Sequence, residues 1–253
     1  MKGKTKISEL EKDCAILLRE KYKGKQTSAF WRDVGLLMKG ELLDYVIGWR
    51  PFLGTKIDLE FRPLIPRDET EFWVEKVLAD LAKDKEFFIL DVFCGSGCIG
   101  IAALKSLKKA KVIFADIDPF CLMQTAKNIK LNKIGLSRAA IKQSDILQDL
   151  EGGFDYIFAN PPYIPEIFVK DVQDSVLRHE SGSFLFGGKD GLQYIRKLLV
   201  QAKKHLKPGG RLFCEFDSRT VKDLRALLKK EGYKAEICKD QFKKPRYFIA
   251  AYK

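Results

Sequence analysis

A regular alternation of apolar strand patterns and amphipathic helix patterns is the feature that most constrains how this chain can fold. Residues 87–93 form a continuous apolar run, a Gly-rich loop follows, and residues 99–107 have a helical pattern. Strands that are apolar throughout belong to parallel sheets, because crossover helices cover both faces of such sheets. The alternation therefore predicts an α/β fold with a parallel-type sheet. The other expected strands are residues 111–116, 139–142, 156–160, 211–216, 233–238 and 247–252, and the other expected helices are residues 70–82, 119–131, 192–206 and 221–231.

The residues before this alternation predict a small helical unit and a connector. Ser8 and Glu11 fit a capping box that would start a first helix, and a second helix is expected over residues 28–40. Glycines and prolines then punctuate short extended pieces, one of them over residues 56–61, which predicts a hairpin-like connector. The chain is therefore divided into a helical domain at residues 1–44, a connector with short strands at 45–66 and an α/β domain at 67–253.

The composition excludes several classes of protein. The 253 residues are 46% hydrophobic, which suffices for a sizeable core and argues against disorder. No apolar run reaches the ~18 residues that a membrane span requires, and the first 25 residues lack the apolar stretch of a signal peptide. Six cysteines without a C-x-x-C pair and only two histidines give no zinc-ligand spacing, so we expect reduced thiols and no metal.

The charge of the chain is less ordinary. There are 46 Lys and Arg residues against 34 Asp and Glu residues, which gives a net charge of +12. A positive field attracts polyanions, so the charge predicts proximity to RNA or to the ribosome. The alternative interpretation is a lysine-rich surface that keeps the protein soluble.

The loop after the first strand has the features of a cofactor-binding loop. Gly95 and Gly97 let the backbone turn tightly and approach a ligand, at the end of a strand where open α/β sheets bind ligands. Asp116 ends the next strand, 19 positions after Gly97, which suits a carboxylate that accepts hydrogen bonds from ribose hydroxyls. Asp91 before the loop, and Asp116 and Asp145 after it, favour a nucleoside with an amino-acid tail over a pyrophosphate. The alternative is a tight turn that binds nothing.

A second loop, Asn160-Pro161-Pro162-Tyr163, lies at the end of the expected strand at residues 156–160. The two prolines stop the sheet and stiffen the loop. The Asn160 amide offers both a donor and an acceptor, and the Pro161 carbonyl is an acceptor without a competing partner. These groups can hold a planar –NH2 group while Tyr163 stacks on its plane. Alone, the loop would fit a proline-rich turn with a capping Asn, but its position after the Gly-rich loop favours a binding site.

Together these segments resemble the HemK/PrmC protein-glutamine N5-methyltransferases, which are class I S-adenosylmethionine-dependent methyltransferases. The Gly-rich loop, Asp116 and the Asn-Pro-Pro-Tyr loop resemble class I methyltransferases that modify a planar amino nitrogen. Residues 64–71, Leu-Ile-Pro-Arg-Asp-Glu-Thr-Glu, resemble the L-I-P-R-P-[DE]-T-E segment that discriminates this family. The resemblance covers roughly residues 40–253. Other positions that match the family are residues 40–48, 186–192, 206–210 and 239–246 and Glu215.

The resemblance implies a Rossmann-like, seven-stranded class I methyltransferase sheet with a small N-terminal helical domain for substrate recognition and a short β-hairpin connector. It also implies S-adenosyl-L-methionine as cofactor and a cytoplasmic monomer that methylates the GGQ-loop glutamine of a class I peptide chain release factor. The implied catalytic residues are Asn160, Pro161, Pro162 and Tyr163, which also bind the substrate together with Arg67 and Glu71. The implied cofactor-binding residues are Asp91, Phe93, Cys94, Gly95, Ser96, Gly97, Asp116, Ile117, Asp145, Ile146 and Asn160.

Three alternatives stay open at this point. The first is an adenine-N6 methyltransferase acting on DNA or RNA, which would use the same loop on a flipped-out base. Against it, the segment at residues 64–71 favours glutamine as the substrate. That segment departs from the family motif only at Asp68, where proline is usual. A ribosomal-protein glutamine methyltransferase is a close sibling, but the Glu-Thr-Glu ending of residues 64–71 is more like the release-factor branch. The third alternative is a non-catalytic cofactor- or RNA-binding protein, because Phe93 stands where the loop motif has its first glycine.

Overall fold

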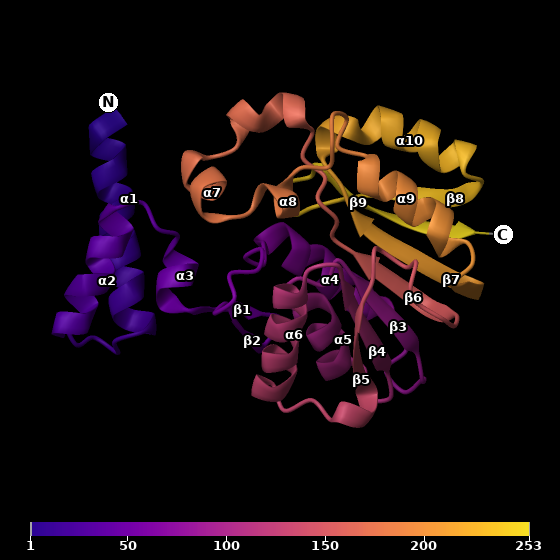
Figure 1. Cartoon of the computed structure of the whole chain (residues 1–253), viewed down its shortest axis with the longest axis horizontal. Coiled ribbons are helices and arrows are strands. Elements are labelled where there is room, and N and C mark those ends of the chain that lie inside the picture. Colours follow the sequence, from indigo (N-terminus) through magenta and orange to yellow (C-terminus); the bar gives the residue numbers. More distant parts are fainter. Residues whose placement is uncertain (1, 253) are drawn as a thin grey trace.

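The chain folds around a seven-stranded sheet with a helical unit beside it (Figure 1). The computed structural model describes residues 2–252, with side chains from residue 8 onward. The strand order is β5-β4-β3-β6-β7-β9-β8, and within the described sheet β9 alone runs opposite to all the other strands. The predicted α/β fold is confirmed. The strands are β3 (Phe88–Val92), β4 (Lys111–Asp116), β5 (Ala139–Gln143), β6 (Phe154–Ala159), β7 (Leu206–Glu215), β8 (Tyr233–Lys239) and β9 (Pro245–Tyr252).

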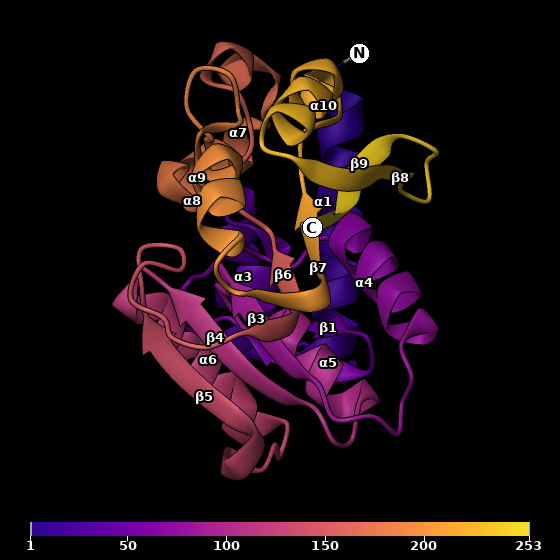
Figure 2. The same ribbon diagram turned by 90° about the vertical axis from the view of Figure 1, so that its right-hand side faces the viewer.

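Helices cover both faces of this sheet and create two cores. Adjacent residues of a strand point to opposite faces, so Ile89 and Leu90 of β3 are both fully buried but belong to different apolar clusters. On one face Trp73 stacks against Phe158 and Tyr247 and is fully buried. Burial of one such side chain stabilises the fold by about 1.5–3 kcal/mol. The covering helices are α4 (Asp68–Asp80), α5 (Cys98–Ser106) and α6 (Pro119–Leu131) on that face, and α9 (Gln193–Ala202) and α10 (Val221–Lys230) on the other (Figures 1 and 2).

Some helices and strands begin and end where the local signals in the sequence predict, and others do not. Helix α6 begins at the predicted residue because Pro119 occupies its first turn and the Asp118 carboxylate accepts the N–H of Phe120. The predicted helix over residues 192–206 is wrong at its end, since α9 stops at Ala202. The Lys-Pro-Gly-Gly segment at residues 207–210 lies within β7, where it forms a bulge opposite the start of β6.

The N-terminal unit consists of α1 (Lys2–Glu20), α2 (Ser28–Met38) and α3 (Leu43–Ile47). The predicted capping box is wrong, because Ser8 lies inside α1. The second helix, α2, is capped by Thr27, whose hydroxyl accepts the N–H of Phe30 at 3.2 Å. Val46 and Ile47 pack with Phe30 in one apolar cluster. The predicted boundary after residue 44 falls within α3, and we propose that the helical unit extends to residue 47.

The connector is the antiparallel hairpin of β1 (Trp49–Phe52) and β2 (Thr55–Asp58), as the punctuated sequence predicts. Two side-chain amides satisfy the outer edge of β2, one from Asn128 in α6 and one from Asn132, which caps the end of that helix. Asn132 bonds both the N–H and the C=O of Lys56, at 3.1 and 2.8 Å, and Asn128 bonds both groups of Asp58, at 2.8 and 3.0 Å. We call these contacts the amide ladder. They fasten the hairpin to the sheet domain.

Residues 164–191 have no strand or helix in the sequence prediction, yet they form a compact segment between β6 and α9. It holds three short helices, the 3-10 turn η2 (Glu166–Asp171), α7 (Asp174–His179) and α8 (Gly182–Leu185). In Figure 1 this segment lies between the helical unit and α9. No helix among the described residues is both long and apolar enough to cross a membrane.

Candidate active site

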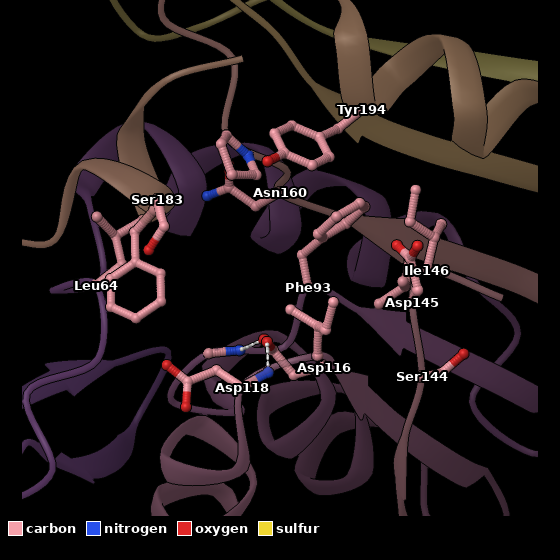
Figure 3. A pocket seen from close by; sticks show the side chains of 15 residues that line it. Leu64, Phe93, Asp116, Asp118, Ser144, Asp145, Ile146, Asn160, Ser183 and Tyr194 are labelled. Carbon is pink, nitrogen blue, oxygen red and sulfur yellow. Dashed lines mark hydrogen bonds between the residues drawn. The ribbon is translucent and has the colours of Figure 1, made fainter. Parts of the chain in front are cut away.

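A cavity of about 280 Å³ opens at the carboxyl ends of three neighbouring strands. Phe93 follows β3, Asp116 ends β4 and Asn160 follows β6, so the strand order 4-3-6 brings the two predicted loops together. Figure 3 shows Asn160 and Tyr194 on one side of the cavity, and Asp116 and Asp118 on the opposite side. The lining residues are Leu64, Val92, Phe93, Gly95, Asp116, Ile117, Asp118, Ser144, Asp145, Ile146, Asn160, Pro162, Ser183, Phe184 and Tyr194.

The Gly-rich loop is shaped by close packing. Gly97 has a φ of +76°, and a Cβ on it would lie 2.9 Å from the side chain of Thr125. Behind the loop the buried Asp91 accepts the N–H of Gly100, at 2.8 Å, which ties the loop to the start of α5. Burial raises the pKa of Asp91 to about 8. Asp91 does not line the cavity, so its contribution to the site is to hold the loop.

Among the described residues, Asp116 is one of three acids that line the cavity, together with Asp118 and Asp145. Its Oδ2 accepts the N–H of Gly95 at 2.9 Å and its Oδ1 accepts the N–H of Asp118 at 3.0 Å (Figure 3). Burial raises the pKa of Asp116. A carboxylate has about four acceptor positions, so two remain for hydroxyl groups of a ligand.

Phe93 takes the left-handed backbone conformation, with φ +57°, at the position where the motif has glycine. The loop therefore keeps the conformation that glycine favours, at the cost of some backbone strain. The Phe93 ring packs edge-on against Tyr194, with centroids 6.1 Å apart, and lines the cavity. Cys94 and Ser96 are buried and turned away from the cavity: the Cys94 thiol lies 3.5 Å from the Thr125 hydroxyl, and burial raises its pKa.

The remaining predicted cofactor residues form the other wall. Ile117, Asp145 and Ile146 all line the cavity together with Ser144, which follows β5. Ile117 is largely exposed, whereas Ile146 is buried. This wall combines apolar side chains with one carboxylate, which suits a flat aromatic ring with polar edges.

The Asn-Pro-Pro-Tyr loop separates this cavity from a smaller one of about 100 Å³. Leu64, Asn160 and Phe184 line both cavities, so the two meet at these residues, and Asn160 is the polar one among them. Arg67 and Tyr163 line only the smaller cavity. The full lining of the smaller cavity is Leu64, Arg67, Asn160, Pro161, Tyr163, Ile164, Val176, Phe184 and Leu185.

Arg67 and Glu71, both predicted to bind the substrate, lie in different surroundings. Arg67 lines the smaller cavity and pairs with the buried Glu180, which also accepts the N–H of Ile65 at 3.1 Å. Burial raises the pKa of Glu180. Glu71 lines neither cavity, and its carboxylate accepts the N–H of Leu53 in the hairpin turn at 2.6 Å.

Several residues of the site are absent from the sequence prediction. Ser183 and Phe184 come from the segment at residues 164–191, and Tyr194 comes from the start of α9. Glu215 is named from the sequence only as a match to a family position, without a role, and it accepts the Tyr163 hydroxyl at 2.7 Å. The signal that could have marked it as functional is an acid inside the apolar strand pattern at residues 211–216. Among the described residues no cluster of three or more His, Cys, Asp or Glu could hold a metal ion.

Comparisons with known proteins agree with this geometry. Residues 70–180 match the methyltransferase small domain. The release factor glutamine methyltransferase of Lactococcus lactis subsp. lactis is 32% identical over 85% of this chain and 78% of its own length. That of Clostridium acetobutylicum is 32% identical over 95% of this chain and 87% of its own length.

A solved structure, the N-terminal domain of human METTL16 in complex with SAH, shares the fold. It has a TM-score of 0.55 and 20% identity, and the match covers 79% of this chain and 76% of that one. With the seven-stranded sheet, the two loops at its carboxyl edge and relatives at 32% identity over most of their length, the chain belongs to the release factor glutamine methyltransferase family.

Proposed function

We propose that this chain transfers a methyl group from S-adenosylmethionine to the side-chain nitrogen (N5) of the glutamine in the GGQ loop of a class I peptide chain release factor. The observation that supports this most is the meeting of two cavities at Asn160, a larger one suited to the cofactor and a smaller one suited to an amide side chain. Membership of the family supports the choice of protein substrate.

The lining of the larger cavity supports S-adenosylmethionine as the cofactor. Gly95 presents backbone without a side chain, and Asp116 keeps acceptor positions for ribose hydroxyls. Phe93, Ile117 and Ile146 supply apolar surface for the adenine ring. When bound, S-adenosylmethionine supplies a methyl group on a positively charged sulfur, which a nucleophile can attack.

The residues around the smaller cavity would position the glutamine amide. Its nitrogen is a weak nucleophile, because the lone pair is delocalised into the carbonyl. We expect the Asn160 Oδ1 and the Pro161 carbonyl to accept the two amide hydrogens and to aim the nitrogen at the larger cavity. Well-oriented reactants can lower a barrier by about 7–11 kcal/mol. Both acceptors also stabilise the positive charge that develops on the nitrogen.

The remaining parts of the proposal concern the partner. We propose that residues 1–47 help to hold the release factor and that the protein acts as a cytoplasmic monomer. The net charge of +12 supports an approach to ribosome-associated material.

The test uses labelled S-adenosylmethionine with a release factor, with the same factor carrying a substitution of the GGQ glutamine, and with total RNA. Label is expected on the unmodified factor alone. Label on RNA and none on the release factor would overturn the proposal. Asn160→Ala should retain cofactor binding by calorimetry and lose methyl transfer, and turnover near that of the wild type would remove Asn160 from the catalytic role.

A further inference from the structure

A carboxamide such as Asn160 has a donor end and an acceptor end of nearly the same shape. Only the Oδ1 end can accept a hydrogen from a substrate amide. Nothing in the asparagine itself decides which end faces the substrate. Asn160 lies with Nδ2 3.2 Å from the Thr70 Oγ1. Within residues 8–252 no group donates to its Oδ1, which is not buried.

The contacts beyond Thr70 fix this orientation. Glu215 lies at the end of β7 with 1% of its surface exposed. Its Oε2 accepts the Trp73 Nε1–H at 2.8 Å and the Thr70 hydroxyl at 2.7 Å, and its Oε1 accepts the Tyr163 hydroxyl at 2.7 Å. Burial raises the pKa of Glu215, and the hydrogen bonds from Thr70, Trp73 and Tyr163 act against this by favouring the carboxylate form. An indole N–H can only donate, and in the carboxylate form both Glu215 oxygens are acceptors only.

The donor and the acceptor in each hydrogen bond from Glu215 through Thr70 to Asn160 can then be assigned in turn. The Thr70 hydroxyl has one hydrogen, and Glu215 accepts it. Only a lone pair of Thr70 remains for Asn160, so the end of Asn160 that faces Thr70 must be the donor, Nδ2. The acceptor Oδ1 is consequently left for the substrate.

We propose that Glu215 and Thr70 are positioning residues that hold Asn160 with its acceptor end toward the methyl-accepting nitrogen. The inference rests on the proposed function and deepens it, because it explains why the site selects a group that donates hydrogens, such as an amide –NH2. The Tyr163 hydroxyl supports the same carboxylate, so Tyr163 acts through Glu215 as well as through its ring. Neither Glu215 nor Thr70 lines either cavity, which separates their role from direct contact with cofactor or substrate.

The test compares Thr70→Val, which removes the hydroxyl and keeps the shape, with Thr70→Ser, which keeps the hydroxyl. Without the hydroxyl, the donor end of Asn160 faces a methyl group and has no acceptor in the productive orientation, so the turned amide is favoured. The kcat for release factor methylation should then fall about 10- to 100-fold, the factor expected when one donor is left without its acceptor. The KM for the release factor and the Kd for S-adenosylmethionine should stay within about threefold, because the cavity linings are unchanged. Thr70→Ser should restore kcat to within about threefold of the wild type.

Thr220→Val is the matched control, because Thr220 is also buried, its hydroxyl donates to the Asp217 carbonyl at 2.8 Å, and it lines neither cavity. It should leave kcat unchanged. A wild-type kcat in Thr70→Val would overturn the inference. Absence of methylation by the folded wild type would overturn the proposed function instead.

A measurement without substrate keeps the two proposals separate. In the NMR spectrum of the wild type, the Asn160 side-chain NH2 protons should show nuclear Overhauser effects to the side chain of Thr70. The absence of these signals in the folded protein would overturn the inference whatever the protein methylates. The same measurement applies if Thr70→Val does not fold.

Discussion

Gly97 lies so close to Thr125 that a Cβ on Gly97 would be 2.9 Å from both Oγ1 and Cγ2 of the threonine. Thr125 is buried and itself donates to the Gly95 carbonyl at 3.1 Å, so it cannot easily move. Gly97→Ala should therefore destabilise the protein by about 1–3 kcal/mol through overpacking and a strained φ. It should also weaken S-adenosylmethionine binding, because the loop must shift.

Gly95→Ala is the matched comparison. Gly95 also has a positive φ, +53°, but a Cβ there would meet nothing within 4 Å. Its effect on the free energy of unfolding should be the smaller of the two, and urea denaturation of both variants measures the difference. Equal losses would show that the contact with Thr125 is unimportant.

A second prediction concerns the buried carboxyl of Asp91. Burial, with the nearby Asp116 adding to it, raises its folded pKa to about 8, well above the unfolded value of about 4. The folded state therefore holds this proton more tightly, so the stability that Asp91 contributes is present at low pH and is lost as the pH rises from about 4 to about 8. An asparagine can still accept the Gly100 N–H and does not titrate. Asp91→Asn should thus gain stability relative to the wild type as the pH rises.

Urea denaturation of the cofactor-free proteins at several pH values checks this. The difference in the free energy of unfolding should grow between pH 5 and pH 8, with a slope of at most about 1.4 kcal/mol per pH unit. Parallel stability curves for the two proteins would mean that Asp91 does not titrate in this range.

A third prediction concerns Asp116, which holds two backbone N–H groups and faces the cavity. Asp116→Asn keeps the shape but leaves one of those donors facing an amide NH2, and it removes charge-assisted acceptors for the ligand. Each hydrogen bond to a charged group is worth about 1.5–3 kcal/mol, so the Kd for S-adenosylmethionine should rise at least about tenfold. Calorimetry measures this. Asp223→Asn, the same change on the exposed face of α10, should leave the Kd unchanged.

A fourth prediction concerns the ion pair of Arg67 and Glu180. The Glu180 side chain is fully buried, whereas Arg67 is about one-third exposed. Arg67→Ala leaves the carboxylate without its counter-charge, which should cost about 1–3 kcal/mol of stability at neutral pH, less than for a fully buried pair. Acidification should reduce this loss, because a protonated Glu180 needs no counter-charge.

Denaturation of Arg67→Ala at pH 5 and pH 8 checks both statements. Arg178→Ala is the control, since Arg178 lies in the same segment as Glu180 and pairs with Asp174 at 3.8 Å on the surface. Such exposed pairs contribute about 0–1 kcal/mol. An Arg67→Ala loss no larger than that of the control would contradict the importance of the buried pair.

The parts of the fold that could be predicted are those whose signals are local. Strand β4 and helix α6 match the prediction to the residue, because apolar runs and the Asp118-Pro119 start are visible in the sequence itself. The segment at residues 164–191 could not be predicted, since its short helices have no periodic pattern and depend on packing over the strand ends.

The candidate site, like the fold, could be predicted only in part. The sequence identifies Asp91 and Asp116 as acids at strand ends, but only the folded chain distinguishes the one behind the loop from the one facing the cavity. Thr70 and Glu71 are neighbours on α4, about 100° apart around the helix. Thr70 consequently contacts Asn160, while Glu71 contacts the hairpin. The sequence predicts the residue types at a site, but their direction depends on tertiary packing.

The amide ladder fixes the register of the connector hairpin against α6. Four residues of a helix advance by about 6 Å, and two residues of a strand advance by about 6.6 Å. Asn128 and Asn132 can therefore serve Asp58 and Lys56 together, as a neighbouring strand would. Asn128 also donates to the Ser96 carbonyl at 2.9 Å, so the spacing between the hairpin and the cofactor loop is set by one side chain. One residue inserted into β2 would bring the wrong backbone groups to these amides and separate the connector from the loop.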